Sequence, residues 1–166
     1  MSDDLTKHFA DEASRIEEDT DHSAKGHYNA AEYWGRWHKA LGSAATVVSG
    51  LAAATALKEA APAVVAVFSV IAALLSGVMT FLNPSELADR HHRAGDQSLA
   101  VRNAARMFRN VELKVAEQSE SVARLKQIAM MRDEVLKSAP VIPNRSYSQA
   151  KRGIESGEST HAVDKR

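Results

Sequence analysis

The chain has 166 residues, equal numbers of basic and acidic side chains, and no cysteine. The charge balance gives no overall field that would attract nucleic acid, and the lack of cysteine excludes disulfides, thiolate metal sites and a cysteine nucleophile. A slightly negative mean hydropathy is typical of a soluble protein. That average conceals an apolar stretch at residues 40–85, whose only charges are the adjacent Lys58 and Glu59.

The N-terminal segment predicts a short amphipathic helix. It lacks the basic and apolar regions of a cleavable signal sequence. Four apolar residues recur at helical spacing among acidic ones: Leu5, Phe9, Ala13 and Ile16. The polar run at residues 19–23, followed by Gly26, predicts a break before a second helix. We therefore expect residues 1–26 to form one helix and a break.

Aromatic and basic residues crowd together just before the apolar stretch. The aromatic ones are Tyr28, Tyr33, Trp34 and Trp37, and Arg36, His38 and Lys39 lie among them. Amphipathic rings with basic neighbours are favoured at a bilayer interface, so we interpret the four rings as an interfacial belt. The alternative is a tryptophan cluster inside a helical core.

Residues 40–57 and 60–82 predict two transmembrane helices. They would be about 27 Å and about 34 Å long, against a hydrocarbon core of about 30 Å. The short connection at Lys58 and Glu59, with Pro62 fitting a first helical turn, predicts an antiparallel hairpin. Cations before and after the hairpin predict that both termini are cytoplasmic. A soluble chain of this length would have little surface with which to hide two helices that are apolar all round.

Small residues form one row on each predicted span. On the first span they recur every four residues and predict a helix-packing face toward the second span or a neighbouring subunit: Gly42, Thr46, Gly50 and Ala54. On the second span they form a weakly polar row: Ser69, Ala73, Ser76 and Thr80. The hydroxyls of that row either bond to backbone carbonyls and neighbouring helices or line a pore in a homo-oligomer.

A single long helix is predicted after the second span. Apolar residues recur every seven positions from Leu87 to Leu136, which predicts an amphipathic cytoplasmic helix over residues 85–137, capped by Ser85 and bent at Gly95. Pro140 and Pro143 end it, and a short helix begins at Ser146 or Ser148 before a polar tail. The expected fold is thus all-α, with residues 27–137 as the central region and 138–166 as linker, short helix and tail.

No catalytic, cofactor-binding or metal-binding residue is predicted. Asp89, His92 and Asp96 share a helical face, but carboxylate-bridged metal sites need ligands from several helices, so solvated surface residues are the preferred interpretation. Glycine-rich phosphate loops, nucleophile elbows and zinc protease signatures are absent from the sequence. Four charged or ionisable residues follow the second span: Arg90, His91, His92 and Arg93. We interpret them as a candidate contact for an anion or a lipid headgroup. The alternative is that they are solvated surface charges.

The entry to the first span reads AAEYWGRWHKALG, the exit from the second reads FLNPSELADRHHRAGDQ, and APVIPNRSYSQAKRGI lies near the C-terminus. Together with the Ala-rich pair of spans and the charged helix after it, these segments resemble the SLATT family of two-helix membrane proteins from prokaryotic conflict systems. We therefore expect the chain in the bacterial inner membrane. The resemblance covers most of the chain from about Tyr28 to Ile154. It rests on residue type and spacing rather than on an active-site motif, and the entry and exit segments carry most of it.

The resemblance implies a non-enzymatic effector that perturbs or perforates the cell membrane on infection and kills or arrests the host cell. It also implies a partner, because family members are often encoded beside nucleotide-second-messenger synthetases or nucleotide sensors. The other expected partners are the lipid bilayer and further copies of the chain. A membrane-anchored adaptor, whose hairpin only tethers cytoplasmic helices, is the alternative from a different functional class. A soluble helical bundle is the third interpretation.

Overall fold

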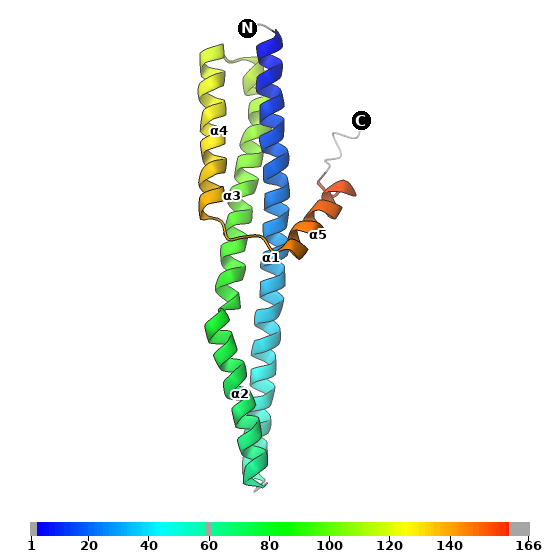
Figure 1. Ribbon diagram of the computed structural model, residues 1–166, viewed down its shortest axis with the longest axis vertical. Helices are drawn as coiled ribbons and strands as arrows, with labels where there is room; N and C mark the ends of the chain where they lie inside the picture. Colours follow the sequence, from blue (N-terminus) through cyan, green and yellow to red (C-terminus); the bar gives the residue numbers. More distant parts are fainter. Residues whose placement is uncertain (1–2, 59–60, 160–166) are drawn as a thin grey trace. The chain divides into compact units, whose positions relative to one another are not determined.

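The computed structural model describes residues 3–58 and 61–159, and within these ranges the chain is all-helical with no strand. The elements in chain order are α1 (Asp3–Leu57), α2 (Pro62–Leu82), α3 (Pro84–Asn110), η1 (Glu112–Lys114), α4 (Gln118–Ser138) and α5 (Asn144–Glu155) (Figure 1). They divide into two compact units: unit 1 is Met1–Ala30 with Arg90–Arg166, and unit 2 is Ala31–Asp89. The predicted all-α class is confirmed.

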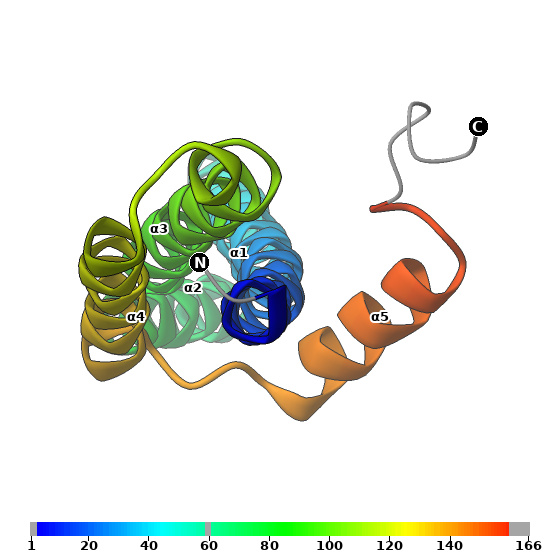
Figure 2. The same ribbon diagram turned by 90° about the horizontal axis from the view of Figure 1, so that it is seen from above.

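Unit 1 is built around one hydrophobic core between the first part of α1, most of α3, and α4 (Figure 2). Its buried members are Ala13, Ile16, Val101, Ala105, Phe108, Leu113 and Ile128. Phe108 is fully buried and is the largest of them. Ion pairs join α1 to α3 beside this core, with 3.0 Å between Arg102 and Asp21 and 3.0 Å between Arg109 and Glu17. The predicted stripe at Ala13 and Ile16 is therefore a core face.

The predicted break at residues 19–26 is wrong, because α1 continues through it to Leu57. Hydroxyls of this polar run bond within the helix: Thr20 donates to the carbonyl of Ile16 at 2.6 Å and Ser23 to that of Asp19 at 2.9 Å. Gly26 is also helical, and a Cβ there would lie 3.1 Å from Ile142. The glycine makes room for the segment between α4 and α5 and does not mark a turn.

The predicted single helix over residues 85–137 is also wrong. Helix α3 ends at Asn110, and α4 starts at Gln118, where Glu117 and Glu120 form a reciprocal capping box. The seven-residue row is split by this turn: Val101 and Phe108 are buried, whereas Val115 is 83% exposed. Folding α4 back places Ile128 and Leu113 in the core, which one straight helix could not do. Helix α3 continues through Gly95 without interruption, and a bend there stays a prediction.

Of the other predicted helix ends, the end of α4 is confirmed, while the starts of α5 and α3 lie earlier than predicted. Helix α4 ends at Ser138, before Pro140 as predicted, while α5 begins at Asn144, earlier than the predicted Ser146 or Ser148. Asn83 ends α2 in the left-handed conformation (φ 40°), and α3 begins immediately afterwards at Pro84 rather than after a Ser85 cap. Glu59 and Ala60 of the predicted turn and second span, and most of the polar tail, lie outside the described residues.

Unit 2 contains the C-terminal part of α1, all of α2, and the first turns of α3 (Figure 1). Its two apolar helices pack on each other: Met79 Sδ lies 3.7 Å from where a Cβ on Gly42 would be. Partly buried residues recur at spacings of three and four on both helices and form a row that we call the seam. The seam residues are Leu41, Ala45, Val48, Ala52 and Thr55 on α1, and Val65, Phe68, Ala72, Leu75 and Met79 on α2.

Candidate membrane segment and histidine pair

The apolar helices of unit 2 expose most of their large side chains. Helix α2 has no buried residue, and Val67, Leu74 and Phe81 are 56%, 64% and 89% exposed. The structure has two helices long and apolar enough to cross a membrane, and the most apolar window of each is not buried. The core helix of a soluble protein would be mostly buried, so these two apolar windows are not core segments of this chain.

The predicted packing row on α1 is only partly in contact with α2. Gly42 is partly buried against Met79, whereas Thr46, Gly50 and Ala54 are exposed. A Cβ added to Gly50 would meet nothing within 4 Å. Contact between α1 and α2 thus uses the seam, and a role of the exposed members toward another subunit stays a prediction.

The predicted pore-lining row on α2 is exposed throughout: Ser69, Ala73, Ser76 and Thr80. The Thr80 hydroxyl donates to the carbonyl of Ser76 at 2.9 Å, and Thr46 on α1 makes the same bond to Gly42 at 2.9 Å. Backbone bonding therefore accounts for the threonine hydroxyls of the two apolar helices, Thr46, Thr55 and Thr80. Whether the row lines a pore stays a prediction.

The four rings of the predicted interfacial belt divide into two groups. Tyr33 makes edge contacts with Trp34 and Trp37, with centroids 5.3 and 6.4 Å apart, and Trp37 is 46% exposed. Tyr28 belongs to unit 1, where its hydroxyl donates to Asp96 at 2.7 Å and its ring meets His92 edge-on. A bilayer contact of Tyr33, Trp34 and Trp37 stays a prediction. Tyr28 instead links α1 to α3 through its hydrogen bond to Asp96.

Two histidines form a buried pair that sequence reasoning missed. His27 and His91 are 3% and 2% exposed, and their Nδ1 atoms lie 3.0 Å apart. The sequence grouped His91 with Arg90, His92 and Arg93 as an exposed contact for anions, and its burial corrects that prediction, while the other three are exposed. Sixty-four positions separate the two histidines, so no local spacing could indicate the contact.

The surroundings of this pair shift several pKa values. Burial, together with the neighbouring His91, lowers the pKa of His27 to about 4, and burial also lowers the pKa of His91. Since one Nδ1 must donate and the other accept, the neutral pair has complementary tautomers. Burial and the bond to Asp96 raise the pKa of Tyr28 to about 12, and the same bond lowers the pKa of the Asp96 carboxyl. The pair is therefore held neutral near pH 7.

Gly95 leaves space for the Tyr28 ring, which leads to a prediction. A Cβ at Gly95 would lie 2.9 to 3.2 Å from three ring carbons of Tyr28. Helix propensity favours Gly95→Ala by about 1 kcal/mol, but overpacking costs about 1 to 3 kcal/mol, so we expect a net loss of stability. In a Tyr28→Ala background the same change should become stabilising by about 1 kcal/mol.

Chemical unfolding of the intact chain, the two single variants and the double variant in detergent micelles measures this reversal of sign. Gly35→Ala is the matched control, because a Cβ there would meet nothing within 4 Å and should stabilise in both backgrounds. An equal effect of Gly95→Ala with and without the Tyr28 ring would contradict the proposed contact.

The comparison with protein families decides the identity of the chain. A family model described as SMODS and SLOG-associating 2TM effector domain family 4 matches residues 18–166. The chain belongs to this SLATT family. Comparisons with curated proteins and with solved structures gave no match. The matched range begins within α1 and includes both apolar helices, so the two membrane-span candidates are the two helices of a SLATT effector domain.

The matched family is described as an effector domain. Among the described residues, no group of three or more histidine, aspartate or glutamate side chains could hold a metal ion. His92 Nδ1 and Asp96 Oδ2 lie 3.2 Å apart, and both side chains are more than half exposed. This exposure agrees with the preferred interpretation of the two residues as solvated surface residues.

Proposed function

We propose that this SLATT chain is a membrane-embedded effector of a prokaryotic conflict system, which perturbs or perforates the inner membrane when triggered and so kills or arrests the cell. The exposure of α2 carries this proposal. A helix with no buried residue and many large apolar side chains at its surface needs an apolar solvent. The family assignment supports the effector role.

In the proposed topology, residues 40–57 and 62–82 cross the membrane as an antiparallel hairpin with both termini in the cytoplasm. The connection between α1 and α2 spans only residues 58–61, which is too short for a parallel pair. Lysines and arginines flank the hairpin on the side of unit 1, with a single lysine in the connection. This asymmetry supports the cytoplasmic placement of unit 1.

The seam divides the surface of such a hairpin into two sides of different chemistry. On α2 the residues on one flank of the seam are all small, and those on the other flank are all large. The small ones are Ala66, Ser69, Ala73, Ser76 and Thr80, and the large ones are Val64, Val67, Ile71, Leu74, Val78 and Phe81. On α1 one flank is again small, with Gly42, Thr46, Ser49, Ala53 and Ala56, while Val47 and Leu51 lie on the other.

Antiparallel packing brings the two small flanks to the same side. Equivalent flanks of an antiparallel two-helix pair face the same way, so one side of the hairpin would carry only small residues and hydroxyls. Close approach of helix backbones in lipid favours small residues, and large aliphatic residues suit lipid contact. We therefore propose that copies of the chain assemble through the small side, where the hydroxyls line a pore if one opens.

Ala73→Leu tests this assembly. Ala73 lies on the small side and is exposed, so a larger side chain would not disturb the seam but would hold a neighbouring helix away. We expect at least a tenfold smaller crosslinked oligomer fraction in membranes, and loss of growth arrest when the chain is expressed. Val70→Leu is the control, since Val70 is 58% exposed and lies off the small side. Unchanged oligomer size in Ala73→Leu would count against the small side as the interface.

The trigger is proposed to come from a partner protein. The family description names association with SMODS and SLOG proteins, which supports a nucleotide-second-messenger synthetase or a sensor as that partner. The rival function, a membrane-anchored adaptor, draws on one observation: unit 1 has a hydrophobic core of its own and could act as a tethered domain. Membrane leakage separates the two, because an adaptor leaves the membrane sealed.

A further inference from the structure

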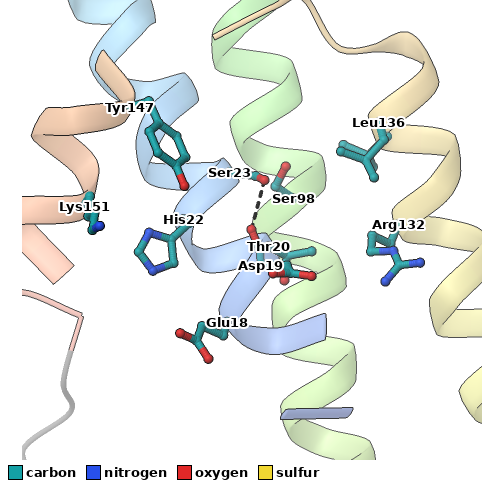
Figure 3. Close-up of a pocket in the computed structure, with 11 residues that line it drawn as sticks. Glu18, Asp19, Thr20, His22, Ser23, Ser98, Arg132, Leu136, Tyr147 and Lys151 are labelled. Carbon is teal, nitrogen blue, oxygen red and sulfur yellow. Dashed lines mark hydrogen bonds between the residues drawn. The ribbon is translucent and has the colours of Figure 1, made fainter. Parts of the chain in front are cut away.

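A groove with a volume of about 480 Å³ crosses α1 within unit 1. Residues 18–23 of α1 and Ser98 of α3 form its floor, α4 forms one wall and α5 the other (Figure 3). We call it the α4–α5 groove. Its wall residues are Arg132, Val135 and Leu136 on α4, and Tyr147 and Lys151 on α5.

Several polar groups of the groove already have partners. The hydroxyls of Thr20, Ser23 and Ser98 donate to carbonyls of their own helices at 2.6, 2.9 and 2.8 Å. The Arg132 guanidinium donates to Asp133 at 3.0 Å. These groups explain the stability of the walls and floor, and none of them needs a ligand.

Three other polar groups have donor capacity left. His22 Nδ1 is buried and forms no hydrogen bond within the described ranges. The Tyr147 hydroxyl points toward His22 in Figure 3, and Tyr147 is 48% exposed. The Lys151 ammonium is 3.9 Å from Glu155, and both side chains are more than half exposed, so this ion pair is weak. An imidazole, a hydroxyl and an ammonium thus line one side of the groove, and the apolar side chains of Val135 and Leu136 line the opposite wall (Figure 3).

We propose that the α4–α5 groove binds a small organic anion, with its acidic group held by Lys151, Tyr147 and His22. The apolar part of the ligand lies against Val135 and Leu136 on the opposite wall. Glu18 and Asp19 also line the floor, and their charge opposes ligands that are negative along their whole length. The site therefore suits a molecule with one anionic head, either a phosphate or a carboxylate, and an apolar body.

Such a ligand would fix α5 in place. The face that α5 buries consists of small residues, Ser146, Ala150 and Gly153, so it removes little apolar surface from water. The Asn29 side chain of α1 donates a hydrogen bond to the Ser146 carbonyl of α5 at 3.3 Å. Lys25 of α1 forms an ion pair with Glu158, in the turn that follows α5. A ligand that contacts both α5 and α4 adds to this weak docking by mass action.

Amide hydrogen exchange of the full chain in detergent micelles tests the site, with phenyl phosphate, benzoate and benzylamine as probes at constant ionic strength. We expect one of the two anions to slow exchange across α5 saturably, by at least about fivefold, and benzylamine to have no effect. The anion that acts identifies the head group. Lys151→Gln should raise the apparent Kd at least about tenfold, since it removes a charge-assisted bond.

Lys126→Gln is the matched control, because Lys126 is an exposed lysine of α4 that does not line the groove. It should leave the apparent Kd unchanged. His22→Gln provides a second test on the floor of the groove and should also weaken binding. Absence of saturable slowing with both anions, equal slowing with benzylamine, or an unchanged Kd in Lys151→Gln would each overturn the proposal.

Discussion

Replacing Leu74 and Leu75 by arginine should remove the chain from the membrane. Both residues lie near the centre of α2, where Leu74 is 64% exposed and Leu75 is in the seam. Each arginine at the centre of a transmembrane helix costs about 2.5 to 3.5 kcal/mol, so the pair costs about 5 to 7 kcal/mol. We expect most of the variant to be released from membranes by an alkaline carbonate wash that leaves the intact chain in place.

A second pair of substitutions separates this effect from added charge alone. Val115 and Val141 are 83% and 91% exposed and lie in unit 1, so Val115→Arg with Val141→Arg adds the same charge outside the proposed spans. This control should remain in the membrane fraction. If the Leu74 and Leu75 variant resists the wash as well as the control does, α2 does not cross the membrane.

Acid should destabilise unit 1 through the buried histidine pair. The pKa of His27 is about 4 in the folded chain and 6.5 when unperturbed, and that of His91 is lowered in the same direction. Between pH 6.5 and pH 4 the unfolded chain therefore binds more protons than the folded chain, so the free energy of unfolding falls as the pH falls. For His27 the loss is on the order of 2 to 3 kcal/mol, and it is absent above pH 7.

Chemical unfolding of the full chain in micelles at pH 7.5 and pH 4.5 measures this loss. His27→Gln removes the titrating group and should flatten the dependence on pH, even if it lowers stability at both values. His8→Gln is the control, because His8 is exposed on α1 and should leave the dependence intact. Other groups beside the pair are Tyr28, His92 and Asp96, and the lowered pKa of Asp96 places its own effect at more acidic pH. Equal pH dependence in the intact chain and in His27→Gln would contradict the account.

Local patterns were enough to predict the helices but not their lengths. The apolar spans and the stop before Pro140 follow from composition and proline chemistry, which act within a few residues. The break predicted at residues 19–26 failed because serine and threonine hydroxyls can bond back to their own helix as well as cap a new one. The end of α3 depends on packing Ile128 of α4 against the core that contains Phe108 of α3, and only the capping box at Glu117 and Glu120 signals it in the sequence.

Contacts between distant residues account for most of what the sequence did not reveal. The burial of His91 depends on His27, and the role of Gly95 depends on the Tyr28 ring, which are pairs that no local spacing records. The small row of α2 was visible in the sequence, whereas the row predicted on α1 included Gly50 and Ala54, which lie off the proposed small side. The proposed placement of the small flanks on one side of a hairpin required knowing which residues form the seam, because a rotation of one helix by a quarter turn would separate them.

Dye entry and membrane potential in bacteria that overexpress the intact chain test the central claim most directly, because a high copy number favours assembly by mass action and so replaces the partner's trigger. The Leu74 and Leu75 double-arginine variant serves as the uninserted control, and Ala73→Leu as an inserted chain that does not assemble. The account predicts depolarisation and propidium entry with the intact chain, and neither with the two variants. A membrane that keeps its potential while the intact chain is fully inserted and crosslinks as an oligomer would contradict the effector function and favour a tether.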